Sequence, residues 1–381
     1  MKIVYCLNSI SHFGGIATVI TTKANALADI EGNQVYVCVS DYVDSYLSRR
    51  LSPKVNLINL DINYYQDDWK SRWHLLRATI IKRHRHKKAL KETLNSINPD
   101  IVISAGQSEK YFLPKIKGKW KSIREIHFVT NYRDYIAFSA IEKLVNKLIT
   151  FYDFRWKIRS YDHVVLLTHE DRQRNWNNKS GVSVIPNPLT IVASEKAALD
   201  SKKIITLGRF VYQKDYPSLI RAYSIVANRY PDWKLIIYGD GSQEQSIRKQ
   251  IASLKLTDKI LLPGVTESPV EALAEASLFV LSSKFEGFGL TIIEAMAVGL
   301  PVVSYECPCG PKDVISDGRD GFLVKTGDEQ ALAEKIIYLI ENPQVRKQMG
   351  AAAKLKSLDY SIERITQMWM ELFNSLIENR K

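Results

Sequence analysis

The sequence predicts an α/β protein built from two doubly wound domains. Its 381 residues are too many for one ordinary core and suit two domains of Rossmann size. Short β-branched runs alternate with longer helical patterns in both halves, which is typical of βαβ units and parallel sheets. Pro186 and Pro188 interrupt the alternation and precede a polar stretch, which is typical of a linker. We therefore expect one domain over 1–187 and a second over 188–358.

The first half contains six runs of strand length, separated by patterns with helical periodicity. The expected strands are 3–7, 34–39, 55–60, 100–104, 122–127 and 163–168. The expected helices are 16–30, 69–97 and 141–159. The first strand leads directly into a polar turn with no long apolar region behind it, so we expect no signal peptide.

A second alternating series follows the linker. Its expected strands are 203–207, 233–238, 260–262, 278–281, 301–304 and 321–324. Its expected helices are 216–229, 242–254, 270–274, 290–298 and 328–341, and a last helix over 361–379 closes the chain. In doubly wound sheets ligands bind at the carboxyl ends of the strands, so we expect the ligand in a cleft where the two domains face each other.

Composition and charge narrow the function classes. Hydrophobic residues make up 45% and charged residues 25%, which are ordinary globular values, and no apolar run approaches the roughly 18 residues of a membrane span. Four cysteines make no disulfide framework in a chain of this length, and we expect a cytoplasmic protein. Residues 1–190 hold 29 Lys and Arg against 17 Asp and Glu, which accounts for the whole net charge of +12. This one-sided charge predicts an anionic partner for the first domain.

The segment 278–303 carries the most specific pattern. A buried strand leads into a loop that contains Glu286, and Glu294 follows eight positions later inside a helix. Gly287 and Gly289 let backbone amides approach a ligand closely, and the start of the helix adds unpaired amides that favour an anion. Two carboxylates spaced in this way can bind different hydroxyls of an extended polar ligand. The alternative is a surface glutamate and a helical glutamate placed together by chance.

Glu286-x7-Glu294, with the residues around it, resembles the signature of the large retaining glycosyltransferase family 4. The resemblance implies the GT-B fold, with two Rossmann-like domains and a C-terminal helix, 359–381, that packs back on the first domain. It also implies that Glu286 lies at the donor sugar and that Glu294 binds the ribose. The backbone of Phe288, Gly289, Leu290 and Thr291 would then face the sugar and the diphosphate.

A second pattern follows the strand 203–207. Gly208-Arg209 ends that strand and Lys214 follows five residues later, and two fixed cations suit a diphosphate leaving group. The pattern resembles the family's Gly-Arg and Lys-Gly pair, which binds the donor pyrophosphate. Here Lys214 is followed by Asp215 where glycine is usual, which leaves the local turn open. A solvated pair of cations at a helix start is the alternative.

Five further residues are assigned from the same resemblance. Gly14 and Gly15 follow the first strand and would contact the donor from the first domain, although such a pair is often only a turn. Gly239 would belong to the family's Gly-x-Gly after a strand, and Val265 to the segment whose backbone contacts the nucleobase. His127 would point at the donor sugar, whereas a lone histidine is more often structural.

The chain contains no Asp-x-Asp, the carboxylate pair that holds a divalent ion in the other large glycosyltransferase fold. We therefore expect no metal and no cofactor. The stretch 306–313 resembles the Cys-Pro-x-Gly-Pro-x-Glu loop of members that use UDP-hexoses, with Asp313 in place of glutamate. The prediction is a hexosyltransferase that moves a hexose from a UDP-sugar to a glycan or a polyprenyl-diphosphate-linked acceptor in surface polysaccharide biosynthesis.

Three alternatives remain beside this prediction. A dehydrogenase is one of them, although the chain lacks the Gly-x-Gly-x-x-Gly fingerprint of a dinucleotide site. A GDP-mannose-dependent mannosyltransferase is the alternative within the class. A basic nucleic-acid-binding protein is the alternative from another class, although the chain lacks recognisable nucleic-acid-binding motifs and we expect no such partner.

The stretch 70–91 carries nine Lys and Arg and three His, with a broken apolar stripe that includes Trp69, Trp73, Leu90 and Leu94. A core-packed helix with a solvated basic face explains this pattern. A face that meets anionic lipid headgroups explains it equally well and predicts peripheral attachment to the inner face of the plasma membrane.

Overall fold

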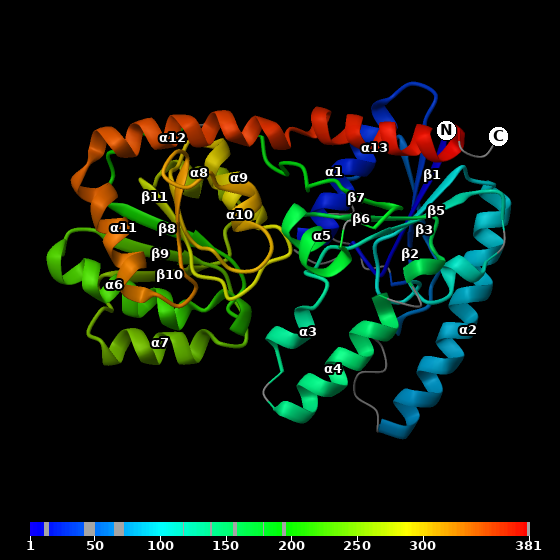
Figure 1. Ribbon diagram of the computed structural model, residues 1–381, viewed down its shortest axis with the longest axis horizontal. Helices are drawn as coiled ribbons and strands as arrows, with labels where there is room; N and C mark the ends of the chain where they lie inside the picture. The colour runs from blue at the N-terminus through cyan, green and yellow to red at the C-terminus, as the bar shows by residue number, and fades with distance from the viewer. Residues whose placement is uncertain are drawn as a thin grey trace. The chain divides into compact units, whose positions relative to one another are not determined.

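The computed structural model describes residues 1–10, 15–41, 50–64, 72–116, 118–137, 139–154, 158–177, 179–192 and 196–378 (Figure 1). The chain divides into two compact units. Unit 1 comprises Met1–Leu167, Asn175–Thr190 and the C-terminal segment from Ile362, and unit 2 comprises Thr168–Arg174 and Ile191–Ser361. The sequence placed the change of domain at 187/188 and did not anticipate that 168–174 group with the second unit.

Unit 1 is built on a parallel sheet of seven strands in the order β3-β2-β1-β4-β5-β6-β7. The strands are β1 (Lys2–Leu7), β2 (Gln34–Val39), β3 (Val55–Asn59), β4 (Ile101–Ser104), β5 (Lys121–Glu125), β6 (His163–Leu166) and β7 (Val182–Val184). β1, in the middle of the sheet, is buried over Ile3–Leu7, as its β-branched and aromatic sequence predicts. The strand expected over 122–127 ends at Glu125, so His127 lies in the loop beyond it.

The helices of unit 1 are α1 (Gly15–Asp29), α2 (Arg72–Ile97), α3 (Tyr132–Tyr135), α4 (Ala140–Tyr152) and the C-terminal α13 (Ile362–Glu378). Figure 1 shows α13 beside α1, and Ile365, Trp369 and Phe373 of α13 are buried in the same hydrophobic cluster as Ile3 and Ile20. Burial of these large apolar side chains is the main force that holds the end of the chain on unit 1. The helix expected over 141–159 is shorter and ends at Tyr152.

Unit 2 is built on a parallel sheet of six strands in the order β10-β9-β8-β11-β12-β13. The strands are β8 (Lys203–Leu207), β9 (Lys234–Tyr238), β10 (Ile260–Gly264), β11 (Leu278–Leu281), β12 (Val302–Tyr305) and β13 (Gly321–Val324). The helices are α6 (Tyr216–Arg229), α7 (Glu244–Ser253), α8 (Pro269–Ala274), α9 (Leu290–Ala297), α10 (Pro311–Val314), α11 (Glu329–Glu341) and α12 (Pro343–Ser357). α5 (His169–Trp176) contains the division between the units.

The prediction of two doubly wound α/β domains is confirmed by these two sheets. Helix α12 was not predicted, because it carries few apolar residues and a glycine in its middle. Gly350 explains its packing, since a Cβ atom there would lie 2.3 Å from the carbonyl oxygen of Gly299 at the end of α9. Among the described residues, no helix combines the length and the apolar character needed to cross a bilayer.

Candidate functional site

The predicted residues of unit 2 lie in loops that leave the carboxyl ends of neighbouring strands, at one edge of the sheet. Backbone hydrogen bonds tie these loops to one another. The amide of Gly208 donates to the carbonyl of Tyr238 at 3.0 Å, and the amide of Glu286 donates to the carbonyl of Pro308 at 3.0 Å. The loops after β8, β9, β11 and β12 therefore form one connected rim.

Glu286 is the most heavily bonded side chain of this rim. It is only 6% exposed, and its Oε1 atom accepts from Lys214 Nζ at 2.7 Å and from the Ser283 hydroxyl at 2.6 Å. Gln213 donates to Oε2 at 3.3 Å. The sequence assigned Lys214 and Glu286 to different parts of a ligand, whereas the structure places them in direct contact. Gln213 and Ser283 were not anticipated, although each is close in sequence to one of the pair.

The turn after Lys214 can form with Asp215 in the position where the family pattern has glycine. Asp215 adopts the left-handed conformation, with φ 48° and ψ 45°. Aspartate tolerates this conformation better than most residues other than glycine. The Asp215 carboxylate also pairs with Lys284, and the Ser282 hydroxyl donates to the Lys214 carbonyl at 2.9 Å. Asp215 therefore keeps the turn that a glycine would allow and adds an ion pair to the loop after β11.

The start of α9 has the features of an anion site. Gly289, with φ 89°, precedes the helix, and no side chain of the described residues caps its first turn. The hydroxyl of Thr291 in that turn is buried and has no hydrogen-bond partner in the part of the chain that the structure describes. Phe288 is buried against Tyr360, with 5.5 Å between the ring centroids, and Leu290 is half-buried. Uncapped amides and an unpartnered hydroxyl are suitable donors to a phosphate oxygen.

The remaining predicted residues of unit 2 differ in exposure. Glu294 is half-buried on α9, Arg209 is exposed directly after β8, and Val265 is 57% exposed after β10. Gly239 has φ 144°, and a Cβ atom there would lie 2.0 Å from the carbonyl oxygen of Gly208. Only glycine fits this close approach of two loops, so Gly239 has a structural requirement of its own.

The loop after β12 contacts the segment 168–174. The backbone amides of His169 and Glu170 donate to the Asp313 carboxylate at 2.7 and 3.2 Å. The Glu170 carboxylate in turn accepts from the amide of Cys309 at 2.8 Å. These bonds explain why 168–174 group with unit 2, and they give Asp313 a capping role at the start of α5 that the sequence did not reveal.

The cysteines do not form a reactive pair. All four are buried and free, and burial raises the pKa of the thiols of Cys307 and Cys309. The thiol pair in the loop after β12 is therefore structural. Among the described residues, no group of three or more histidine, cysteine or acidic side chains is placed to hold a metal ion.

Two of the predicted residues of unit 1 are described: Gly15, which follows β1 in the chain, and His127, which follows β5. Gly14 lies outside the described residues, and Gly15 is the exposed first residue of α1. His127 is buried, with its Nε2 atom 3.4 Å from Oε1 of Glu125, which also pairs with Lys23 of α1. Burial raises the pKa of Glu125, but Lys23 and His127 outweigh it and lower that pKa to about 2. The His127 ring therefore lies beside a buried carboxylate, and its Nε2 atom makes no hydrogen bond to the described residues.

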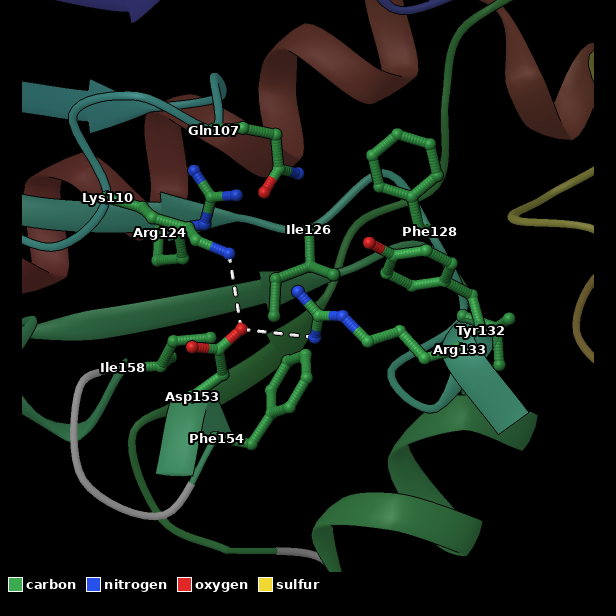
Figure 2. A pocket seen from close by; sticks show the side chains of 11 residues that line it. Gln107, Lys110, Arg124, Ile126, Phe128, Tyr132, Arg133, Asp153, Phe154 and Ile158 are labelled. Atoms are coloured by element: carbon green, nitrogen blue, oxygen red, sulfur yellow. Dashed lines mark hydrogen bonds and ion pairs between the residues drawn. The ribbon is translucent and has the colours of Figure 1, made fainter. Parts of the chain in front are cut away.

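Unit 1 also contains a small polar pocket (Figure 2). Figure 2 shows Lys110 and Arg133 pointing toward Asp153, at 3.3 and 3.1 Å. Arg124 lines the same pocket and donates to the carbonyl of Gly106 at 2.5 Å. The pocket has a volume of about 20 Å³, which is enough for a water molecule but not for a sugar. No residue that the sequence singled out for the donor lies in it.

Comparison with known proteins identifies the domain. Residues 190–356 match the family described as glycosyl transferases group 1. An uncharacterized glycosyltransferase of Haemophilus influenzae is 26% identical over 97% of this chain and 98% of its own length. The poly(ribitol-phosphate) alpha-N-acetylglucosaminyltransferase of Staphylococcus aureus is 29% identical over 76% of this chain, which spans 57% of that protein.

The fold has close relatives among solved structures. A mutant of S. aureus TarM, in complex with Fondaparinux, alpha-GlcNAc-glycerol and UDP, superposes with a TM-score of 0.78. The two chains share 19% identity, and the match covers 98% of this chain and 99% of TarM. Residues 190–356 of this chain therefore form a glycosyl transferases group 1 domain, within a fold that is that of the GT-B glycosyltransferases.

Proposed function

We propose that this protein is a retaining, metal-independent hexosyltransferase that uses a UDP-hexose donor. Its acceptor is a hydroxyl of a glycan or of a lipid-linked sugar in surface polysaccharide biosynthesis. The observation that carries the proposal is the buried Lys214–Glu286 ion pair beside the uncapped start of α9. It puts a cation, a carboxylate and backbone donors at the strand edge where doubly wound sheets bind ligands.

Each part of the donor has a proposed partner in unit 2. Arg209 and Lys214 bind the diphosphate, together with the amides and the Thr291 hydroxyl at the start of α9. Glu294, one turn into that helix, accepts hydrogen bonds from the ribose hydroxyls, and the backbone at Val265 contacts the base. The UDP that TarM binds in its solved complex supports this choice of nucleotide.

Charge stabilisation accounts for the chemistry of the transfer. The bond from the anomeric carbon to the β-phosphate oxygen breaks, a bond from that carbon to the acceptor oxygen forms, and the acceptor's proton passes to an oxygen of the departing diphosphate. Negative charge grows on the departing diphosphate, and fixed cations and amide dipoles stabilise it without reorganisation. We propose that this set replaces a divalent ion.

Glu286 acts at the sugar in this proposal. Glu286 is held by Lys214, Ser283 and Gln213, so its position is fixed before the donor binds. The role of His127 at the sugar stays a prediction from the sequence. In unit 1 its Nε2 atom lies 3.4 Å from Oε1 of Glu125. The acceptor class follows the relatives, which include a lipopolysaccharide 1,6-galactosyltransferase of Escherichia coli.

A thermal-shift screen tests the proposal. A ligand that binds only the folded chain raises the melting temperature, by an amount that grows with its concentration relative to Kd. UDP and one or more UDP-hexoses should raise the melting temperature in the presence of EDTA. Stabilisation by GDP-mannose alone would favour the mannosyltransferase alternative, and stabilisation by nucleic acid alone, lost at higher salt, would favour the nucleic-acid alternative.

A further inference from the structure

Helix α4 exposes an apolar stripe along its whole length. Residues at spacings of three and four form the stripe, and none of the side chains of α4 is buried. The stripe consists of Ile141, Leu144, Val145, Leu148, Ile149 and Tyr152, which are 77, 62, 46, 63, 39 and 48% exposed. A continuous apolar face of this kind on a soluble chain marks an interaction surface.

The helix is well formed. The Ser139 hydroxyl accepts from the amide of Glu142 at 3.1 Å, and the Glu142 carboxylate accepts from the amide of Ser139 at 3.1 Å. This capping box fixes the first turn, so the stripe is presented by an ordered helix.

A basic groove lies next to the stripe. It has a volume of about 480 Å³ and is lined by Arg83 and Lys87 of α2, by Tyr111, Phe112 and Lys115, and by Tyr152 of α4. Three of these residues are cations and none is a carboxylate. Tyr152 belongs to both the groove and the stripe. The basic groove, which suits anionic groups, therefore adjoins the apolar stripe, which suits hydrocarbon chains.

The charge of α2 strengthens this pairing. Over 80–97, Lys82, Arg83, Arg85, Lys87, Lys88 and Lys91 oppose the single acidic residue Glu92. Of the apolar stripe that the sequence expected on α2, Leu90 and Leu94 are fully buried in the core of unit 1, whereas Ile80 is 63% exposed. Trp69 lies outside the described residues. α2 thus supplies charge together with the exposed Ile80 and Ile81, and α4 supplies the longer exposed apolar face.

We propose that unit 1 docks on an anionic lipid bilayer through the α4 stripe and the basic groove. Lipid phosphates occupy the groove beside Arg83, Lys87 and Lys115, while the stripe lies at the boundary between headgroups and acyl chains. A second copy of the chain is a poorer occupant, because a two-fold interface around the stripe brings the same cations together. This surface lies outside the proposed donor site, and the inference does not depend on that site.

Vesicle co-sedimentation tests the proposal with matched variants. The wild type should bind vesicles of phosphatidylcholine with phosphatidylglycerol at low salt, and Leu144→Ser with Leu148→Ser should lower the partition coefficient at least tenfold. Leu355→Ser with Leu358→Ser is the control, because these leucines are 70 and 60% exposed in unit 2. Arg83→Gln with Lys87→Gln should weaken binding and flatten its salt dependence, whereas Lys249→Gln with Lys347→Gln should change neither.

A fluorophore reports the contact directly. All four native cysteines are buried, so Leu148→Cys can be labelled selectively with an environment-sensitive dye. Its emission should shift to the blue when anionic vesicles are added, and the dye on Leu355→Cys should not respond. An unchanged melting temperature in both labelled proteins shows that the chain remains folded.

Two results would overturn the proposal. In the first, the wild type does not co-sediment with anionic vesicles at low salt, and the emission of the dye at position 148 does not shift. In the second, light scattering without lipid shows a dimer that Leu144→Ser with Leu148→Ser converts to a monomer, which would make the stripe a contact between copies.

Discussion

The ammonium group of Lys214 lies 2.7 Å from Oε1 of Glu286, although the two residues are 72 positions apart in the chain. The pair is largely buried, with side-chain exposures of 16 and 7%. A buried ion pair is costly to break, because removal of one partner leaves the other charge without compensation. Lys214 therefore has two roles in this account, as partner of Glu286 and as ligand of the donor diphosphate.

Lys214→Ala should lower kcat/KM more than tenfold, which corresponds to about 1.4 kcal/mol or more of transition-state stabilisation. It should also lower the melting temperature, because Glu286 remains buried without its cation. Arg209→Ala, at an exposed position, should lower kcat/KM to a similar degree without the loss of stability. Lys203→Ala, which breaks an exposed pair with Glu275, is the control and should change neither quantity. Unchanged kinetics in both Lys214→Ala and Arg209→Ala would refute the diphosphate assignment.

Substitution of Glu294 and substitution of Glu286 should affect different quantities, the affinity for UDP in the first case and the turnover rate in the second. Glu294→Gln should weaken the binding of UDP and of the donor, because it removes the proposed acceptor for the ribose hydroxyls. Glu286→Gln should impair turnover more than UDP binding, because Glu286 acts at the sugar. Isothermal calorimetry with UDP, combined with steady-state kinetics, measures both effects. Equal UDP affinity in the two variants and the wild type would contradict this division.

Gly310→Ala should weaken UDP binding. A Cβ atom at Gly310 would lie 2.3 Å from the carbonyl oxygen of Phe288, so the substitution displaces the backbone just before α9. Gly318→Ala is a matched control, because Gly318 also has a positive φ, of 76°, and has no neighbour within 4 Å. Gly318→Ala should cost about 1–2 kcal/mol of backbone strain and leave the Kd for UDP unchanged. Gly310→Ala adds the clash with Phe288 to such strain and should raise the Kd for UDP. Equal affinity in both variants would argue against a donor site at the start of α9.

The stability of unit 1 should depend on pH through Glu125. Burial raises its pKa, but Lys23 and His127 outweigh burial and lower the folded-state pKa from 4.5 to about 2. Because the folded pKa is the lower one, this stabilisation is present above pH 4.5 and is lost as the pH falls toward 2. Glu125→Gln should therefore lower the free energy of unfolding by roughly 3 kcal/mol at pH 7 and by much less at pH 3. Urea unfolding at both pH values measures the difference in free energy of unfolding between wild type and variant. A loss of stability that is equal at pH 7 and pH 3 would show that the charge of Glu125 does not cause it.

Most of the fold could be predicted from the sequence, because buried parallel strands are rich in β-branched residues and the linker contains two prolines. Strand β7 was missed because three residues carry no pattern, and α12 was missed because its packing depends on the contact of Gly350 with Gly299. In the site, the motif around Glu286 and Glu294 could be recognised. The Lys214–Glu286 contact could not, because it depends on how two distant loops fold over one sheet edge. The charge of α2 could be recognised in the sequence. The exposed stripe of α4 could not, because exposure depends on how the elements of unit 1 pack.

The most direct test of the central claim is the product formed from a UDP-hexose in EDTA without acceptor, followed by NMR. Water then takes the place of the acceptor, and we predict that UDP and free hexose appear. The first-formed hexose should keep the anomeric configuration of the donor, and Glu286→Gln should release it much more slowly. Release of the opposite anomer, release only after a divalent ion is added, or no release from any UDP-hexose would contradict a retaining, metal-independent UDP-hexose transferase.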